Sequence, residues 1–374
     1  YFDSYYVANN MALILTGDIH IDEIMPIIEE KFGNWEQAEL AAPLNITEED
    51  FNGRELVTAN ITPVKIGTMG FRTVPAKHED FPMLEICKQL LTNESKTGLL
   101  DYLVVNGDIQ DAGMWNLDYV DHGGSMLYFM PMQGVQSLDT AETLLISQLQ
   151  KLKKGDFSEE FFNAVKLTMM RQHEASIESM EDRLFILIDT YIKEYNWQDV
   201  INWPQKLDGI TKEDVLVVAN KYFGDNYLVL HSNEGSPNKF KLEKPTFEPV
   251  VPKNAEASSV FAKRLSNIPD RKLNLQFIEF NKDVQFQDIQ KNIHLYHTKN
   301  PINSIFDLTL QYGIGTLKIP ELEQASELLN LLGTTNYSVN EFKAQLQKIG
   351  TTISFSADRD YFKINIKGFD KNIV

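Results

Sequence analysis

The chain carries one pattern of expected secondary structure twice, at residues 66–134 and again at residues 306–370. Each copy opens with an alternating apolar run, which has the period of a half-buried strand. Two helical stretches follow, and strands that return after a polar turn close each copy. A repeat of this length indicates a duplicated domain and not a solenoid, whose repeating units are much shorter.

The elements expected in the two copies correspond in order. The opening strands lie at residues 66–71 and 306–311, the second helices at 99–104 and 339–349, and the closing strands at 126–130 and 361–366. The first helices each have one apolar face, formed by Leu84, Cys87, Leu90 and Leu91 in the first copy and by Leu322, Ala325, Leu328, Leu329 and Leu332 in the second. Both second helices end near a glycine, Gly107 or Gly350, which accepts the left-handed conformation that often stops a helix. The pattern predicts an α+β fold of duplicated two-layer units, each a sheet covered by helices.

The composition places the chain among ordinary globular proteins, with 374 residues, 43% hydrophobic and 24% charged, enough for two or three domains. The net charge of −18 would repel a phosphate backbone, so we expect no nucleic-acid partner. An acidic field attracts basic peptides, although a solvated acidic surface explains the charge equally simply. No apolar run approaches the length that crosses a bilayer.

Cys87 is the only cysteine, so the chain can form neither an internal disulfide nor a thiolate metal site. It lies on the apolar helix face and is expected in the core.

The segments outside the repeat predict further elements. We expect a strand at residues 11–16, a helix at 22–32, strand-like segments at 273–284 and 292–296, and a linker at 237–269 that is rich in proline. Capping boxes begin helices at Thr211 and Ser338. Because the chain opens at Tyr1 and runs at once into a buried-strand pattern, we expect a fragment whose upstream part, any targeting segment included, is missing.

A search for catalytic and metal-binding patterns finds no convincing site. His294 and His297 are three residues apart in an extended segment and would point to opposite faces. His173 has no second histidine at helical spacing. The chain also lacks a nucleophile elbow, a phosphate-binding loop and a dinucleotide fingerprint. We therefore predict no catalytic, cofactor-binding or metal-binding residue. His20, His78, His122 and His231 are isolated in the sequence, and only the fold can bring them together.

Several stretches, taken in order, resemble the pitrilysin/insulinase family of zinc metallopeptidases, whose motif is an inverted His-x-x-Glu-His. The similar stretches are spread over nearly the whole chain: residues 5–18, 159–178, 208–215, 299–303, 312–313, 333–334 and 350. The resemblance implies that the zinc-binding subdomain would lie before Tyr1. In the second half the motif positions hold Ser326, Leu329 and Asn330, none of which matches the motif.

The resemblance also implies an organisation. Residues 1–51 would be the C-terminal end of a catalytic-type subdomain, 52–235 a complete second α+β subdomain, 236–290 the linker between halves, and 291–374 the start of a second, inactive half. The first and last units would then be incomplete. The remaining subdomains of the parent chain would be partners of this part.

The function implied is zinc-dependent hydrolysis of peptides or small unfolded proteins inside a chamber formed by two halves. This chain would be a non-catalytic fragment of the enzyme, with zinc in the intact parent and none bound here. A catalytically silent scaffold or peptide-binding subunit of the same family is the alternative. The compartment stays open, and a periplasmic or cell-envelope location follows from the family alone.

Overall fold

The computed structural model describes residues 2–40, 42, 47–237, 243–244, 246, 248, 254, 257–269, 275 and 277–373. The chain divides into two compact units. One contains Tyr1–Pro237 together with Ile302–Val374, and the other contains Asn238–Pro301. Within the predicted proline-rich linker at residues 237–269, residues 238–242, 245, 247, 249–253, 255 and 256 lie outside the described residues.

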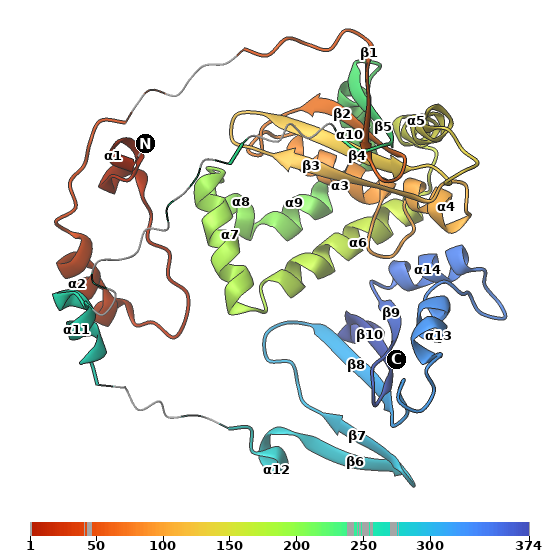
Figure 1. The fold of residues 1–374 in the computed structure, drawn as a ribbon. Helices are drawn as coiled ribbons and strands as arrows, with labels where there is room; N and C mark the ends of the chain where they lie inside the picture. The colour runs from red at the N-terminus through yellow and green to blue at the C-terminus, as the bar shows by residue number, and fades with distance from the viewer. Residues whose placement is uncertain are drawn as a thin grey trace. The chain divides into compact units, whose positions relative to one another are not determined.

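A five-stranded sheet forms the centre of the first unit (Figure 1). Its strand order is β1-β5-β2-β4-β3, with β1 Arg54–Thr62, β2 Ile66–Thr73, β3 Asp111–Asp118, β4 Gly123–Met130 and β5 Tyr227–Glu234. The pair β1 and β5 is parallel and the other neighbours are antiparallel. β1 and β3 are therefore the two edges of a mixed sheet.

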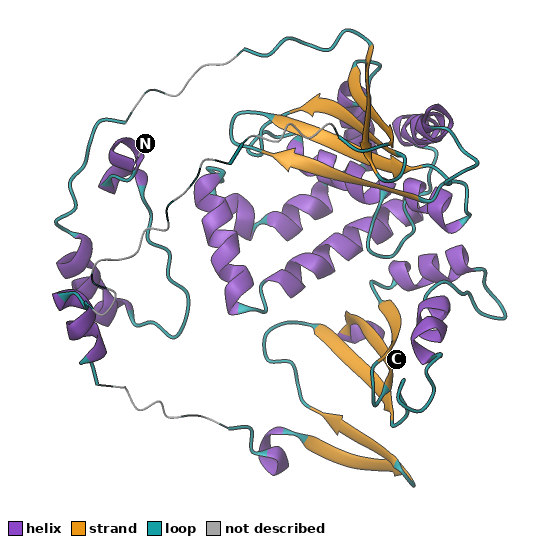
Figure 2. Ribbon diagram, viewed as in Figure 1, coloured by secondary structure: helices purple, strands orange, loops and turns teal. Residues whose placement is uncertain are grey.

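Helices pack on one face of this sheet (Figure 2). The helices in contact with its strands are α3 Phe81–Leu91, α4 Leu99–Val105, α5 Leu138–Lys154 and α10 Lys212–Tyr222. Alternate strand residues point to these helices and are buried, among them Met69, Phe71, Leu127, Phe129 and Val229. Cys87 is fully buried on α3, as predicted. The unit therefore has two layers and one hydrophobic core.

A helical wall follows the sheet in the sequence, formed by α6 Glu159–Ser176, α7 Met180–Ile192, α8 Trp197–Ile201 and α9 Trp203–Gly209. Side chains that accept backbone N–H groups fix where these helices begin. Ser158 caps α6 and Ser179 caps α7, and Thr211 forms the predicted capping box of α10. The helix starts were therefore readable from the sequence because their causes are local.

The C-terminal part of the first unit has its own three-stranded sheet, with the order β8-β10-β9. It consists of β8 Ile305–Tyr312, α13 Leu322–Leu329, α14 Val339–Lys348, β9 Thr352–Ala357 and β10 Phe362–Phe369. The same order of elements and the same strand neighbours occur in β2, α3, α4, β3 and β4. Gly107 and Gly350 both adopt positive φ, at 75° and 61°, as expected for left-handed helix stops.

Polar contacts join this C-terminal part to the rest of the unit. The Thr97 hydroxyl donates to the Gln347 side chain at 2.6 Å, with both groups buried. Lys348 Nζ lies 2.7 Å from a Glu160 oxygen. These contacts place α14 against α6.

Three expectations from the sequence differ from the structure. Residues 11–16 form no strand, since a run of apolar residues forms a strand only where a neighbouring strand supplies hydrogen bonds. Residues 280–283 are a short helix, α12 Phe280–Asp283, and the other described residues of the segment 273–284 are irregular.

The third difference is the apolar helix expected from Leu322 to Leu332. α13 ends at Leu329, and Ser326 is its only buried residue. Leu328, Leu331 and Leu332 are 56%, 62% and 47% exposed. The small sheet therefore does not bury the leucine face that the sequence assigned to the core.

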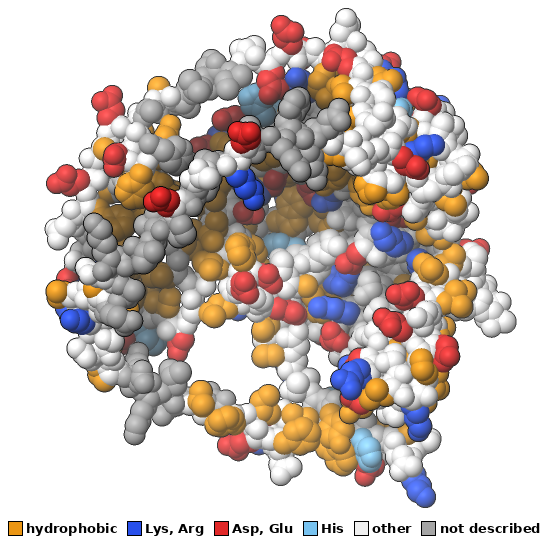
Figure 3. All heavy atoms as spheres, in the orientation of Figure 1, with side chains coloured by type: hydrophobic (Ala, Val, Ile, Leu, Met, Phe, Trp, Pro, Cys, Tyr) orange, Lys and Arg blue, Asp and Glu red, His pale blue; other side chains and the backbone are white. Residues whose placement is uncertain are grey.

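The second unit contains α11 Val260–Ser266, α12, and the antiparallel hairpin of β6 Gln285–Gln290 and β7 Ile293–His297. The remaining short elements are α1 Phe2–Tyr5, α2 Ile21–Phe32 and two 3₁₀ turns at Ala8–Asn10 and Asp370–Asn372. Among the described residues, no helix is both long and apolar enough to cross a membrane. On the face in Figure 3, Lys and Arg side chains lie among acidic ones and form no continuous basic patch.

Candidate functional site

The positions that correspond to the zinc motif lie on and just after α13, and their side chains have structural roles. The Ser326 hydroxyl donates to the Leu322 carbonyl at 2.6 Å, and the residue is 3% exposed. Leu329 has no atom that can ligate a metal. A zinc ion therefore has neither a histidine nor a carboxylate to bind at these positions.

Asn330, the third motif position, fastens the end of α13 to strand β9. Its Nδ2 donates to the Phe355 carbonyl at 3.0 Å, and its Oδ1 accepts the Phe355 N–H at 2.9 Å. The amide thus pairs with both backbone groups of one residue, as a neighbouring strand would. Histidine at this position could not reproduce both bonds, since a neutral imidazole has its donor and acceptor on different sides of the ring.

His294 and His173, considered from the sequence, have separate surroundings in the fold. His294 is on β7, where its Nδ1 lies 2.5 Å from Asp288 and its ring stacks on Phe286. His173 is on α6, and burial lowers the pKa of its imidazole although Glu174 opposes the shift. At neutral pH His173 is therefore uncharged.

The fold brings together one cluster that the sequence did not reveal. Asp139 and Glu142 lie one turn apart on α5, and His231 reaches them from β5, so that three possible ligand atoms lie within 4.8 Å of one another. The acids and the histidine are almost 90 residues apart in the chain. The only signal in the sequence was an acidic pair at helical spacing, which is common on helix surfaces.

The cluster is a salt-bridge network and does not fit a metal ion. Glu142 accepts two bonds from Arg54 at 2.6 and 2.7 Å, one from Tyr227 at 3.0 Å and one from His231 Nε2 at 2.8 Å. Asp139 faces the other ring nitrogen of His231, 3.8 Å away, so the two carboxylates do not converge on one nitrogen. The guanidinium occupies the position where a cation would add charge, and it would repel that cation.

The pKa directions agree with a permanently ionised pair. Burial raises the pKa of the Glu142 carboxyl, but hydrogen bonds from Arg54, Tyr227 and His231 outweigh burial and hold it below its usual value. Burial and the neighbouring Glu142 raise the pKa of Tyr227 to about 12. Glu142 is therefore the charged centre that ties β1 and β5 to α5.

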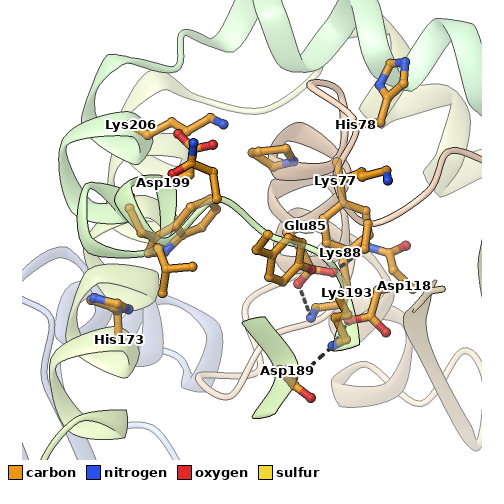
Figure 4. A pocket seen from close by; sticks show the side chains of 18 residues that line it. Lys77, His78, Glu85, Lys88, Asp118, His173, Asp189, Lys193, Asp199 and Lys206 are labelled. Atoms are coloured by element: carbon orange, nitrogen blue, oxygen red, sulfur yellow. Dashed lines mark hydrogen bonds and ion pairs between the residues drawn. The ribbon is translucent and has the colours of Figure 1, made fainter. Parts of the chain in front are cut away.

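A cavity of about 490 Å³ lies between the sheet layer and the helical wall (Figure 4). Its charged side chains come from both sides, with Lys77, His78, Glu85, Lys88 and Asp118 on or beside α3 and β3, and His173, Asp189, Lys193, Asp199 and Lys206 on α6 to α9. Phe81, Tyr195 and Trp203 add aromatic surface.

Most charges in this cavity are paired within its own walls. Lys193 Nζ lies 2.5 Å from Asp118 and 3.1 Å from Asp189, and Lys88 Nζ lies 2.6 Å from Glu85. Burial lowers the pKa of Lys193, but the hydrogen bonds to the two aspartates outweigh burial and raise it. Burial also raises the pKa of Tyr195 to about 12.

The cavity offers few groups for nucleophilic catalysis. Among the described residues that line it, none is a serine, threonine or cysteine. Tyr195 supplies a hydroxyl, but burial raises its pKa to about 12, so it stays protonated at neutral pH. The geometry supports binding of a polar group.

Comparison with known proteins identifies the fold. The family model described as the peptidase M16 inactive domain matches residues 1–169. The zinc protease PqqE of Helicobacter pylori is 21% identical over 229 residues, which are 59% of this chain and 50% of that protein. The chain thus spans about half the length of this curated relative.

Two solved structures share the fold at low identity. A protease from Helicobacter pylori aligns with a TM-score of 0.56 and 19% identity over 62% of this chain and 57% of its own. The periplasmic protease PqqL from Escherichia coli aligns with a TM-score of 0.51 and 14% identity over 99% of this chain and 44% of its own. Residues 1–169 thus match the inactive domain of the M16 peptidases, and the resemblance of the chain to the pitrilysin/insulinase family is confirmed.

Proposed function

We propose that this chain is a catalytically silent part of a zinc-dependent endopeptidase that hydrolyses peptides or small proteins between two halves. The observation that carries the proposal is that the side chains at the motif positions form structural hydrogen bonds. The Ser326 hydroxyl bonds within α13, and Asn330 holds the end of α13 to β9. A helix end used in this way has no free donor set for zinc, so the hydrolytic step belongs to another part of the longer protein.

We propose the following division of labour along the chain. Residues 1–51 complete a catalytic-type subdomain, residues 52–235 form the second subdomain, residues 236–290 link the halves, and residues 291–374 begin the inactive half. The common element order of the two sheet-and-helix parts supports a duplication. The chain would then supply walls of the peptide chamber.

A silent scaffold or peptide-binding subunit is the second candidate. The 490 Å³ cavity, lined by charged and aromatic side chains, favours it as a place where a polar group can bind. The two candidates differ only in what lies upstream of Tyr1. A His-x-x-Glu-His sequence in the gene before Tyr1 supports the peptidase, and a gene without that motif supports the scaffold.

The purified chain should contain no stoichiometric zinc and cleave no peptide. Elemental analysis after dialysis against zinc, together with hydrolysis of a mixed peptide library, checks both expectations. A protein extended upstream to include the motif should bind one zinc and lose its activity with a chelator. One tightly held zinc on this chain, or proteolysis by it that a chelator abolishes, would contradict the proposal.

A further inference from the structure

The face of the five-stranded sheet turned away from the helices is partly apolar and carries a groove of about 530 Å³. Its floor comes from the strand residues that alternate with the core positions, namely Thr68, Gly70, Leu117, Gly124, Met126, Leu228 and Leu230. Leu228 is 37% exposed, and Trp115 on the same face is 40% exposed. Apolar side chains on an open sheet face can bind another chain.

Two glycines make the floor hollow. A Cβ at Gly70 would lie 3.0 Å from Met126 Sδ, and one at Gly124 would lie 3.2 Å from Leu117 Cδ1. Both distances are shorter than ordinary van der Waals contact, so a larger residue would push the neighbouring side chains into the groove. Glycine at these positions keeps the floor open.

Arg72, at one end, is the only lysine or arginine that lines the groove. A segment of the same chain, Glu48 to Phe51, binds it, and we call this segment the strap. Arg72 Nη2 donates to the Glu49 carbonyl at 2.9 Å, and the guanidinium carbon lies 4.5 Å from the centre of the Phe51 ring. The Glu48 carboxylate forms an ion pair with Arg72. One arginine thus recognises a carboxylate, a backbone carbonyl and an aromatic ring.

Two buried polar atoms beside the strap have no hydrogen-bond partner among the described residues. They are Arg72 Nε and Thr73 Oγ1. Buried donors without partners are uncommon because their desolvation is not repaid. A ligand that enters beside the strap, or in its place, can satisfy them.

We propose that this groove binds an extended peptide segment that carries one carboxylate close to an aromatic side chain, and that the strap is its intramolecular competitor. The peptide's carboxylate and ring take the places of Glu48 and Phe51 on Arg72, and its apolar residues lie over Leu228 and Leu230. Asp121 also lines the groove, so a second nearby negative charge on the ligand is disfavoured. The inference uses neither zinc nor the duplicated half, so it stands or falls independently of the proposed function.

The strap determines how tightly a free peptide can bind in the groove. A tethered segment competes at an effective concentration of about 1 mM, so a free peptide binds the native chain weakly. Loss of the strap's contacts removes that competition. The groove is therefore expected to open to other peptides when the strap is weakened.

The test uses the full chain and a fluorescent peptide, capped at both ends, with the sequence Thr-Glu-Gln-Asn-Phe-Asn, which is that of residues 47–52 with Glu49 and Asp50 replaced by amides so that it carries one carboxylate. In fluorescence anisotropy the peptide should bind F51A about five- to tenfold more tightly than the native chain, because the Phe51 ring no longer competes for Arg72. E48Q, a surface change that leaves the fold intact, should give about a two- to fivefold gain.

Arg72→Gln in the F51A background should remove the gain, and Arg72→Lys should restore part of it, since lysine keeps the charge without the planar fork. Arg359→Gln, at an exposed arginine in the turn between β9 and β10, is the matched control and should change nothing. Three results would overturn the proposal. The first is that Arg72→Gln in the F51A background binds the peptide as tightly as F51A alone, and the second is that F51A binds a scrambled peptide as tightly as the original one. The third is that neither F51A nor E48Q binds the peptide more tightly than the native chain.

Discussion

Replacing Glu142 by alanine should lower the free energy of unfolding by about 3 kcal/mol. The carboxylate is 5% exposed and accepts all four bonds that join Arg54, Tyr227 and His231 to α5. Its removal deprives the Tyr227 hydroxyl, Arg54 and His231 of their hydrogen bonds, and Asp139, 3.7 Å from Arg54 and 3.8 Å from His231, replaces them only in part. The effect falls at the lower end of the range for a broken buried pair because the Arg54 side chain keeps 35% of its exposure and can turn to water.

Asp139 offers the matched control for Glu142. It lies on the same helix, 3.7 Å from Arg54, but its side chain is 78% exposed. Asp139→Asn should cost less than about 1 kcal/mol. Urea unfolding followed by circular dichroism measures both variants, and equal losses in the two would show that burial does not govern the network.

The Glu142 contribution should depend on pH with a definite sign. The pKa of Glu142 is lowered in the folded chain, so the folded state binds its proton less readily than the unfolded state. The stabilisation is then complete above the ordinary glutamate pKa and is lost as the pH falls through the lowered value. Because of this linkage, the difference in unfolding free energy between the native chain and E142A should shrink as the pH falls from roughly 5 to roughly 3, a window chosen around the usual pKa of glutamate. A difference that grows on acidification would contradict the assignment.

Asn330→Ala should destabilise the three-stranded part by about 2 kcal/mol, because two backbone groups of Phe355 lose their partners. Asn330→Asp should cost about half as much, since the carboxylate still accepts the Phe355 N–H but cannot donate to the carbonyl. Asn336→Ala, at an exposed asparagine whose side chain makes no hydrogen bond among the described residues, should be neutral.

Hydrogen exchange at the Phe355 amide reports the same clamp directly. This N–H donates to Asn330, and β9 is an edge strand of its sheet. Exchange at Phe355 should therefore accelerate in the alanine variant and stay slow in the aspartate variant. Unchanged protection in Asn330→Ala would show that another group covers this amide.

The sequence predicted the strands and helix starts that depend only on residues close together in the chain. β2 contains the predicted strand at residues 66–71, and β8 contains that at 306–311, because a period of two fixes which residues alternate faces. The capping boxes at Thr211 and Ser338 are present, since all their atoms lie within four residues. Local geometry was therefore sufficient for these elements.

The parts that depend on distant partners were not readable. The strand expected at residues 11–16 needs a neighbour for its backbone groups, and a run of apolar residues does not supply one. The Glu142 network joins residues 54, 142 and 231, and each of them alone reads as an ordinary surface group. The sequence predicted no zinc ligand at Asn330, but the clamp of Asn330 on Phe355 depends on a strand 25 residues further along.

The clamp also disfavours a metal-binding side chain at the end of α13. A single change at Asn330 to histidine would remove two hydrogen bonds before any metal could bind, and a histidine at Ser326 would have to fit a position that is 3% exposed. Each change would therefore lower stability before a zinc site was complete. The hydrogen bonds of Asn330 thus favour the retention of asparagine at this position.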